Sequence, residues 1–390
     1  MTPRVTVLLA VHNGGNYLRD AVDSVLTQTY QDFELLLVDD ASTDDAADSL
    51  PTDPRIRLLR NDRNLGQIPS LNRGLRAARG EYVARLDHDD LCLPRRLELQ
   101  VDLLDRLTDV ALVGGWVDVV DSNDRLWTRL RPCIDSFTDF ALQVVTGRVQ
   151  LVHPSVTFRR SVVLDLGGFD ESLSASEDQE LYRRLVLARC EARVVAETLL
   201  RYRRHEKQMT IAKSAAVWES DARSHDRFLA ALAPGSPPTV TRFMLRTDRR
   251  FWHEPEQPPG WLEHFLDEAS STLRLASSER AALAGALARS ATATMLSGWA
   301  GDSAPDAYRG RALGLATFSR RYGDGWSRAI ASATPFLTRT ALAGAYVGAV
   351  RSGVTRSLRS EALAHARRVA RSSRLLRRMY ARIADTRTHE

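Results

Sequence analysis

Two periodicities alternate along the first 110 residues, and this alternation constrains the fold more than any other feature of the sequence. Short apolar runs at 5–11, 33–38, 56–59 and 82–86 have the length and composition of buried strands. Between them, apolar residues recur at spacings of three and four, as they do on one face of a helix. This order predicts an α/β fold, in which parallel strands are joined by crossover helices that cover both faces of the sheet. The helical positions are Leu18, Ala21, Val22, Val25 and Leu26, then Ile68, Leu71, Leu75 and Ala78, then Leu97, Val101 and Leu104.

The middle of the chain is less regular than its beginning. A turn is expected at 121–124, where Asp, Ser and Asn follow one another. Ser176, followed three residues later by Gln179, fits a capping box that begins a helix. Further strands are expected at 110–113, 117–120, 152–158, 193–196 and 199–203.

Two proline-rich stretches, at 234–238 and 255–260, predict a domain boundary. Beyond them the chain is rich in Ala, Leu and Arg at helical spacing. We therefore expect an α/β domain at 1–232, a linker at 233–260, and an all-helical domain at 261–390.

The carboxyl-terminal tail carries the excess positive charge of the chain. Residues 351–390 hold eleven arginines against Glu361, Asp385 and Glu390, although the net charge of the whole protein is only +5. Apolar residues at helical spacing in the same stretch predict a basic amphipathic helix, which suits an anionic membrane surface. The alternative is a helix that packs on its own domain with a solvated basic face. Aromatic residues are not interleaved with the arginines, so we do not expect nucleic acid as a partner.

Targeting signals give the expected location. The chain enters its first apolar run without the basic region and cleavage site of a signal peptide. No apolar run reaches the about 20 residues that a membrane-spanning helix needs. The three cysteines are widely spaced, which argues against a zinc site or a disulfide framework. We expect a cytoplasmic protein, with peripheral contact to the inner face of the membrane through the basic tail.

Three polar clusters follow predicted strands directly, at 10–15, 39–44 and 87–90. Ligands of an open parallel sheet bind outside the carboxyl ends of its strands, so these clusters are expected to meet at one edge. The third contains three aspartates, whose carboxylates repel one another unless a cation neutralises them. Oxygen ligands favour Mg²⁺ or Mn²⁺, and such an ion also holds a diphosphate. Neither a phosphate-binding GxxxxGK[ST] loop nor a GxGxxG motif is present, which argues against a Walker-type ATPase and a dinucleotide-dependent dehydrogenase.

Four segments resemble one known family in order and spacing. VTVLLAVHNGGNYLRDAVDSVLTQTYQDFELLLVDDASTDD resembles the start of a family 2 glycosyltransferase of the GT-A fold, and RNLGQIPSLNRGLRAARGEYVARLDHDD ends in that family's D-x-D motif. HPSVTFRRSVVLDLGGFDESLSASEDQELYRRL resembles its acceptor-side segment with the catalytic Glu-Asp pair, and RYRRHEKQMT its R-x-H-x(4)-[ST] segment. The resemblance covers about residues 3–212 and implies an inverting transfer of one sugar from a nucleotide-diphosphate sugar. The expected acceptor is a hydroxyl of a glycan or a lipid-linked molecule, in envelope or exopolysaccharide biosynthesis.

The resemblance also implies roles for single residues. Asp39 would contact the base of the donor nucleotide, in a pocket lined by Ala10, His12 and Asn13. Asp178 would be the catalytic base, with Glu177 as the next candidate. The metal, Mn²⁺ or Mg²⁺, would be held by Asp89, with Asp87 near both ribose and metal, and with His205 as a further ligand.

Simpler interpretations stand beside these roles. Glu177 and Asp178 are also residues that any helix amino terminus prefers, and His205 in an arginine-rich stretch is equally expected to be a surface histidine. Ala10, His12 and His88 depart from the residues usual in the family, which leaves the nucleotide base open. No Q-x-x-R-W segment follows Asp178, which argues against a processive synthase.

Two alternatives remain open for the chain as a whole. One is a sugar-nucleotidyltransferase, although residues 11–16 lack the basic triphosphate loop that such an enzyme needs. The other is a catalytically idle GT-A domain used for binding or as a scaffold, although the aspartates of the implied site are intact.

Overall fold

The computed structural model describes residues 2–205, 208, 214–236, 261–299 and 321–322. The chain divides into two compact units, 1–232 and 233–390. The boundary falls where the linker is predicted, but most of that linker lies outside the described residues. The assignment of a catalytic and a helical domain therefore stays a prediction.

The first unit is built on a nine-stranded sheet within the described part of the chain. Strand order along the sheet is β3-β2-β1-β4-β8-β6-β9-β5, and β7 pairs with β6 outside this path. The strands are β1 (Val5–Val11), β2 (Phe33–Asp39), β3 (Ile56–Arg60), β4 (Tyr82–Leu86), β5 (Leu91–Cys92), β6 (Val110–Val120), β7 (Leu126–Leu130), β8 (Thr157–Arg159) and β9 (Glu191–Arg203).

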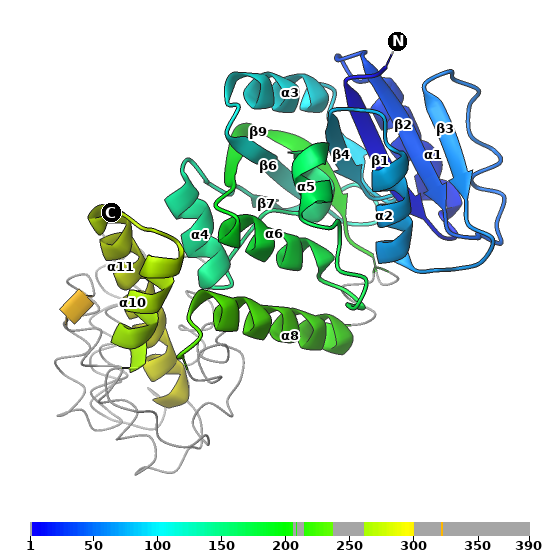
Figure 1. Cartoon of the computed structure of the whole chain (residues 1–390). Coiled ribbons are helices and arrows are strands. Elements are labelled where there is room, and N and C mark those ends of the chain that lie inside the picture. The colour runs from blue at the N-terminus through cyan, green and yellow to red at the C-terminus, as the bar shows by residue number, and fades with distance from the viewer. Residues whose placement is uncertain (1, 206–207, 209–213, 237–260, 300–320, 323–390) are drawn as a thin grey trace, which may run out of the picture. The chain divides into compact units, whose positions relative to one another are not determined.

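Helices cover both faces of this sheet, as predicted (Figure 1). On one face, α1 (Gly15–Leu26) and α3 (Arg96–Arg106) bury their apolar stripes in one core with alternate residues of β1 and β2, such as Val7 and Leu35. On the other face, α2 (Gln67–Ala77) packs so closely that a Cβ on Gly74 would lie 2.2 Å from a methyl of Leu8. The predicted fold class, a GT-A type α/β sheet flanked by helices, is confirmed.

The crossovers in the first half define where a ligand binds. Strands β1 to β4 run parallel to one another, with Val5 opposite both Phe33 and Tyr82. The chain leaves β1 through α1 on one face and reaches β4 through α2 on the other. The carboxyl ends of β1 and β4 therefore flank a topological switch point, which is the position of the ligand crevice in open α/β sheets.

The second half of the sheet differs from the expectation in three elements. Residues 110–120 form one strand, β6, rather than two, and 191–203 form one strand, β9, whose register with β6 shifts near Trp116. The strand expected at 152–158 is wrong: the chain makes a 3-10 turn, η1 (His153–Ser155), before the short β8. Pro154 lies in this turn, because proline cannot donate to a strand ladder.

The glycines Gly114 and Gly115 allow β6 to continue as one strand. A Cβ on Gly115 would lie 2.3 Å from Leu199 Cδ1, and a Cβ on Gly114 would lie 2.5 Å from Leu151 Cδ2. The neighbouring chains occupy the space that side chains would need. The sequence predicted separate strands at 110–113 and 117–120 on either side of this pair, whereas the pair is a point of close packing within one strand.

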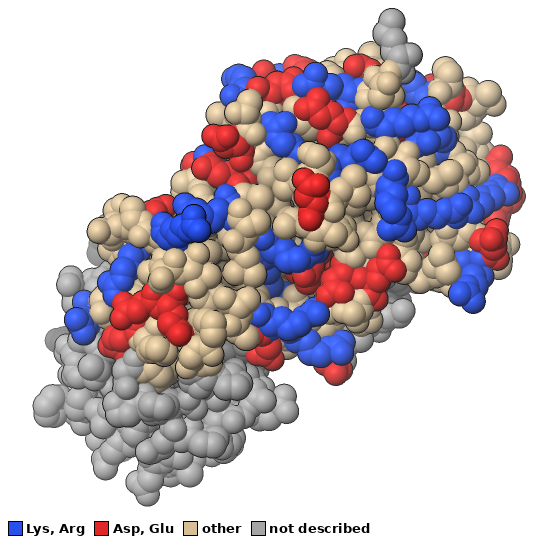
Figure 2. All heavy atoms as spheres, in the orientation of Figure 1, with Lys and Arg blue, Asp and Glu red and all other residues tan. Residues whose placement is uncertain are grey.

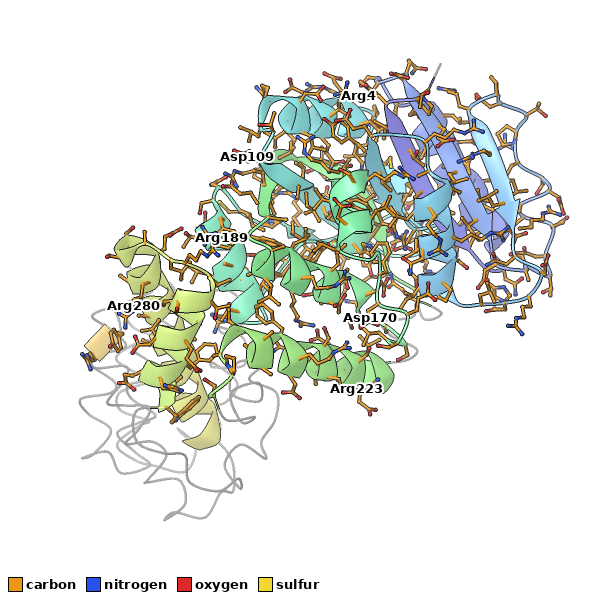
Figure 3. All side chains as sticks on the ribbon, in the orientation of Figure 1. Arg4, Asp109, Asp170, Arg189, Arg223 and Arg280 are labelled. Atoms are coloured by element: carbon orange, nitrogen blue, oxygen red, sulfur yellow. The ribbon has the colours of Figure 1, made fainter. Side chains whose placement is uncertain are left out.

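Three helices complete the second half of the first unit: α4 (Phe137–Val145), α6 (Glu177–Leu187) and α8 (Ser214–Leu232), with the short α5 (Arg160–Asp165) beside α2. Arg189, just after α6 and labelled in Figure 3, lies 4.5 Å from the Phe137 ring centre of α4. Buried Arg183 of α6 reaches Asp221 of α8 at 2.5 Å. Asp170, also labelled, lies in the segment before α6 and accepts a hydrogen bond from Arg227 of α8 at 2.7 Å. These pairs join α6 and its flanking segments to α4 and α8.

The second unit contains α10 (Trp261–Thr272) and α11 (Ser277–Trp299), which agrees with a helical carboxyl-terminal region. In the described residues, no helix is long and apolar enough to cross a membrane. On the face drawn in Figure 2, basic and acidic side chains are interspersed over the described surface. The basic tail at 351–390 lies outside the described residues, so its contact with a membrane stays a prediction.

Candidate active site

A cavity of about 1340 Å³ opens at the carboxyl edge of the sheet. Its walls are the loops after β1 and β4, the end of β9, the turn η1, and the first turn of α6. Most of the predicted site residues line it, although they come from segments up to two hundred positions apart. These lining residues are Ala10, His12, Asn13, Asp87, Asp89, Glu177, Asp178 and His205.

The loop after β1 is tied to the loop after β2 by reciprocal hydrogen bonds. The Asn13 N–H donates to the Ser42 hydroxyl at 3.0 Å, and the Thr43 N–H donates to the Asn13 side-chain oxygen at 2.8 Å. Asn13 and Ala41 both have left-handed backbones, with φ of 56°. For a residue with a side chain this conformation is uncommon and is retained where the surroundings enforce it. Two exposed loops thus form one defined wall.

The two aspartates after β2 have different tasks. Asp39 is buried, accepts from the Ser42 N–H at 2.9 Å, and lies 3.6 Å from Arg60. Asp40 lines the cavity, but its carboxylate accepts from Asn61 and from the N–H groups of Leu65 and Gly66. Both carboxylates therefore fix the loops beside this part of the cavity. The contact of Asp39 with the base stays a prediction.

The acidic cluster after β4 is built as the sequence indicated, with one addition. One carboxylate oxygen from each of Asp87, Asp89 and Asp90 lies within 4.8 Å of the others. Asp90 is fully buried; one oxygen accepts from the Arg203 N–H at 2.9 Å, and the other has no hydrogen-bond partner among the described residues. Burial and the charges of Asp89 and Asp87 raise the pKa of Asp90 well above its ordinary value. A divalent cation would offset the burial of this carboxylate, neutralise the repulsion from Asp87 and Asp89, and give the unpartnered oxygen a ligand. Oxygen donors are the ligands that Mg²⁺ and Mn²⁺ prefer.

Strand β9 brings its carboxyl end to this cluster. The His205 Nε2 lies 2.9 Å from the Asp89 Oδ2, and its ring lies 5.4 Å from that of Tyr17. Buried Arg203 donates to the Asp89 backbone oxygen at 3.1 Å and stacks on Tyr17 at 4.5 Å. The surface-histidine interpretation of His205 does not describe this geometry, because the ring is mostly buried and faces the acidic cluster.

A fully buried arginine lies behind the same cluster. Arg85, on β4, donates to Asp87 Oδ1 at 2.5 Å with a side chain only 1% exposed. Burial alone would raise the pKa of Asp87, but the charges of Arg85 and His153 and the hydrogen bond from Arg85 lower it instead. Asp87 is therefore held ionised. Sequence reasoning missed Arg85, although an arginine inside an otherwise apolar strand is a readable signal of a buried ionic partner.

Glu177 and Asp178 begin α6 and also line the cavity. Buried Glu177 lies with its Oε1 3.3 Å from the Nδ1 of His153. Asp178 is partly buried and accepts from the Gln179 side chain at 3.4 Å. The capping box expected at 176–179 is wrong, because Ser176 has a left-handed backbone with φ of 61° and its hydroxyl donates to the Val217 backbone oxygen.

The pKa values of the two carboxylates are shifted in opposite directions. Burial raises the pKa of Asp178, and the charge of Glu177 raises it further. Burial acts on Glu177 in the same sense, but the hydrogen bond and charge of His153 outweigh it and lower the pKa of Glu177. A helix dipole favours the ionised form of a carboxylate in the first turn, but burial has the larger effect on Asp178. Asp178 thus holds a proton more readily than an ordinary aspartate, which is the direction that suits a base.

Comparison with known proteins decides the family. The sequence model described as "Glycosyl transferase family 2" matches residues 6–166. An uncharacterized glycosyltransferase of Methanocaldococcus jannaschii, MJ1057, is 31% identical over 207 residues, which are 52% of this chain and 71% of that protein. The chain belongs to glycosyltransferase family 2. The family resemblance noted in the sequence is confirmed, and so is the prediction that this is a glycosyltransferase.

Other glycosyltransferases match slightly less than half of the chain. The putative glycosyltransferase EpsE of Bacillus subtilis is 36% identical over 172 residues, which are 43% of this chain and 60% of that protein. An uncharacterized glycosyltransferase of Rickettsia bellii is 30% identical, and the match spans only 27% of its length. Among solved structures, S. aureus TarS 1-349 in complex with UDP-GlcNAc is similar with a TM-score of 0.49 and 16% identity, over 85% of this chain and 92% of that one.

Proposed function

We propose that this family 2 member is an inverting, metal-dependent glycosyltransferase. It would move one sugar from a nucleotide-diphosphate sugar to a hydroxyl of a glycan or lipid-linked acceptor, in envelope or exopolysaccharide biosynthesis. The observation that carries the proposal is that one cavity joins the acidic cluster after β4 to the Glu177–Asp178 pair. Donor activation and acceptor deprotonation need separate groups that face one space.

The loops after β1 and β2 would hold the nucleotide. Ala10, His12 and Asn13 line this end of the cavity, and Asp39 fixes the turn that follows β2. The His12 Nδ1 lies 2.9 Å from the Asp40 backbone oxygen, which sets the ring against the second loop. The reciprocal bonds between the loops keep the wall in place before the nucleotide arrives.

Asp89, Asp87 and Asp90 would hold the cation, with His205 beside Asp89. The all-carboxylate set and the unpartnered oxygen of Asp90 fit Mn²⁺ or Mg²⁺. When bound, such an ion neutralises charge that develops on the departing diphosphate. Arg85 keeps Asp87 ionised and oriented, and Arg203 fixes the backbone of the cluster.

Asp178 would take the proton of the acceptor hydroxyl. Its burial raises its pKa, which makes it a better proton acceptor than an ordinary aspartate once ionised. Asp178, Asp87 and Asp89 line the same cavity but belong to different elements of the chain. A base opposite the leaving group gives one displacement, hence inversion at the anomeric carbon.

A thermal-shift screen tests the proposal. Nucleoside diphosphates and nucleotide-sugars are added with Mn²⁺, with Mg²⁺, or with EDTA, and a true donor raises the unfolding temperature only with metal. The Asp89→Ala variant, which should keep its fold, is expected to lose the metal-dependent shift. Equal stabilisation in EDTA contradicts the metal site, and stabilisation by nucleoside triphosphates and sugar phosphates instead favours the nucleotidyltransferase alternative. Donor binding without any turnover favours the idle binding module.

A further inference from the structure

One ring nitrogen of His153 is paired with Glu177, and the other has no hydrogen-bond partner among the described residues. Its Nδ1 lies 3.3 Å from the Glu177 Oε1, and an ionised carboxylate accepts hydrogen bonds but cannot donate them. Nδ1 therefore carries the hydrogen, and in the neutral ring Nε2 presents its lone pair. The Nε2 atom is buried and has no hydrogen-bond partner among the described residues.

The surroundings of the ring keep it in this orientation. His153 is 9% exposed, and the edge of its ring meets Phe169, with ring centres 5.5 Å apart. It belongs to the turn η1, whose successor β8 pairs with β4, with Thr157 opposite Ala84. This pairing is antiparallel, so the start of β8 lies at the carboxyl end of β4. The ring is thus held by three elements that belong to different parts of the chain.

The His153 ring interacts with carboxylates of both the proposed metal site and the proposed base. The charge of His153 opposes the effect of burial at Asp87 and also at Asp178, so it acts on the pKa of a carboxylate on each wall. His153 itself lines the cavity together with Asp87 and Asp178. A transferred sugar would occupy this interval, because its anomeric carbon is bonded to the diphosphate and is also the carbon that the acceptor hydroxyl attacks.

We propose that His153 is a sugar-binding residue, whose Nε2 forms a hydrogen bond with a hydroxyl of the transferred sugar. Glu177 is the positioning residue that fixes the ring, rather than a second base. This inference rests on the proposed function, and it explains why a polar nitrogen is kept unpaired in a buried place.

Two substitutions of His153 test the roles of its two ring nitrogens separately. His153→Asn keeps a polar group near Nδ1 and removes the one at Nε2. His153→Gln places its amide near Nε2 and gives up the bond to Glu177. As the control, His264→Asn alters a histidine that also pairs with a glutamate, Glu268 at 3.4 Å, but lies in the second unit.

The experiment measures dissociation constants by calorimetry with the full chain and Mn²⁺. The probes are the nucleotide-sugar that stabilises the protein most in the screen above and the nucleoside diphosphate of the same base. His153→Asn is expected to weaken nucleotide-sugar binding about 3- to 10-fold, the usual effect of one hydrogen bond, and to leave diphosphate binding unchanged. His153→Gln should restore part of the loss, and His264→Asn should change neither constant.

Glu177→Ala completes the test through a double-mutant cycle with His153→Asn. If Glu177 acts through the ring, the losses in nucleotide-sugar affinity are non-additive, and the double variant resembles His153→Asn alone. Unchanged nucleotide-sugar affinity in a folded His153→Asn protein overturns the proposal. So does a turnover loss of about 10²-fold or more at unchanged affinity, because that result makes His153 the base. If the wild type binds neither probe, the proposed function fails instead.

Discussion

The two walls of the active site are built in different ways. The proposed donor wall consists of loops that follow parallel strands adjacent in the sheet, so the topology of the sheet alone brings 10–15, 39–44 and 87–90 together. The proposed acceptor wall consists of a 3-10 turn, a left-handed Ser176, and the first turn of α6. Its positions depend on pairings between segments far apart in the chain. The donor wall is thus a property of the fold class, whereas the acceptor wall is a property of this sequence.

The largest expected effect is a loss of turnover, and substitutions on the two walls should differ in whether donor and metal affinity are kept. Asp178→Asn is expected to lower turnover by about 10²- to 10⁴-fold, because the acceptor hydroxyl loses its base. Donor and metal affinity should stay unchanged, since Asp178 lies on the acceptor wall. Asp89→Ala, on the donor wall, should lose both affinity and turnover. Steady-state kinetics and calorimetry on the two variants give this contrast.

Near-normal turnover in Asp178→Asn would contradict this assignment and leave Glu177 as the candidate base, because Asn caps a helix nearly as well as Asp. Retention of configuration in the product, read by NMR of the anomeric proton, would rule out a single displacement.

The next expected effect is on the pH dependence of kcat/KM, and it should arise from the acceptor wall alone. Burial raises the pKa of Asp178 above 3.8, and the base must be ionised, so kcat/KM should fall as pH drops through a midpoint above 3.8. Donor affinity should not follow the same midpoint.

Folding stability should respond to Asp178 with the opposite sign. A raised pKa means that the folded protein holds this proton more tightly than the unfolded chain, so its ionisation lowers stability as pH rises from 3.8 to the folded value. Asp178→Asn should therefore gain stability over the wild type across that window, as measured by denaturant unfolding. A variant that loses stability there would contradict the pKa direction.

A smaller effect is expected where the second half of the sheet is most tightly packed. Gly115→Ala places a Cβ 2.3 Å from Leu199 Cδ1, and overpacking of this kind costs about 1–3 kcal/mol of unfolding free energy. Adding Leu199→Val should recover part of the loss, because it shortens the clashing side chain. Ala196→Ser, at an exposed position of β9, is the matched control and should stay within about 0.5 kcal/mol. Equal losses at both positions would show that β9 is not packed here as described.

The smallest effect concerns the boundary between the units. Limited proteolysis of the full chain should cut first within 233–260, and donor affinity should be unchanged after that cut, because both walls lie within 1–232. Cuts before α8 would count against the division. They would also remove Val217, which accepts from Ser176, and so would affect the acceptor wall before the donor wall.

The sequence predicted the donor wall almost residue by residue and the acceptor wall only through family resemblance. Period and length were sufficient for β1, β2, β4 and their helices, because a buried parallel strand is continuous and apolar. The same rule failed at 152–158, where Pro154 turns the chain, and at Ser176, where a left-handed backbone replaces a cap. A local sequence pattern does not show which distant segments will pack against these residues in the fold. His153, Arg85 and Asp90 acquire their importance from partners that only the folded chain supplies.

The link between His205 and Asp89 has a consequence for how the protein is made. The two residues are 116 positions apart, and β9, which carries His205 to the cluster, lies between β6 and β5 in the finished sheet. A nascent chain therefore exposes Asp87, Asp89 and Asp90 on the ribosome long before Arg203 and His205 emerge to organise them. Translation proceeds from the amino terminus, so the acidic cluster meets Arg203 and His205 only once β9, the last strand of the sheet in chain order, has been made. An unfinished chain on the ribosome thus lacks the complete form of the proposed metal site.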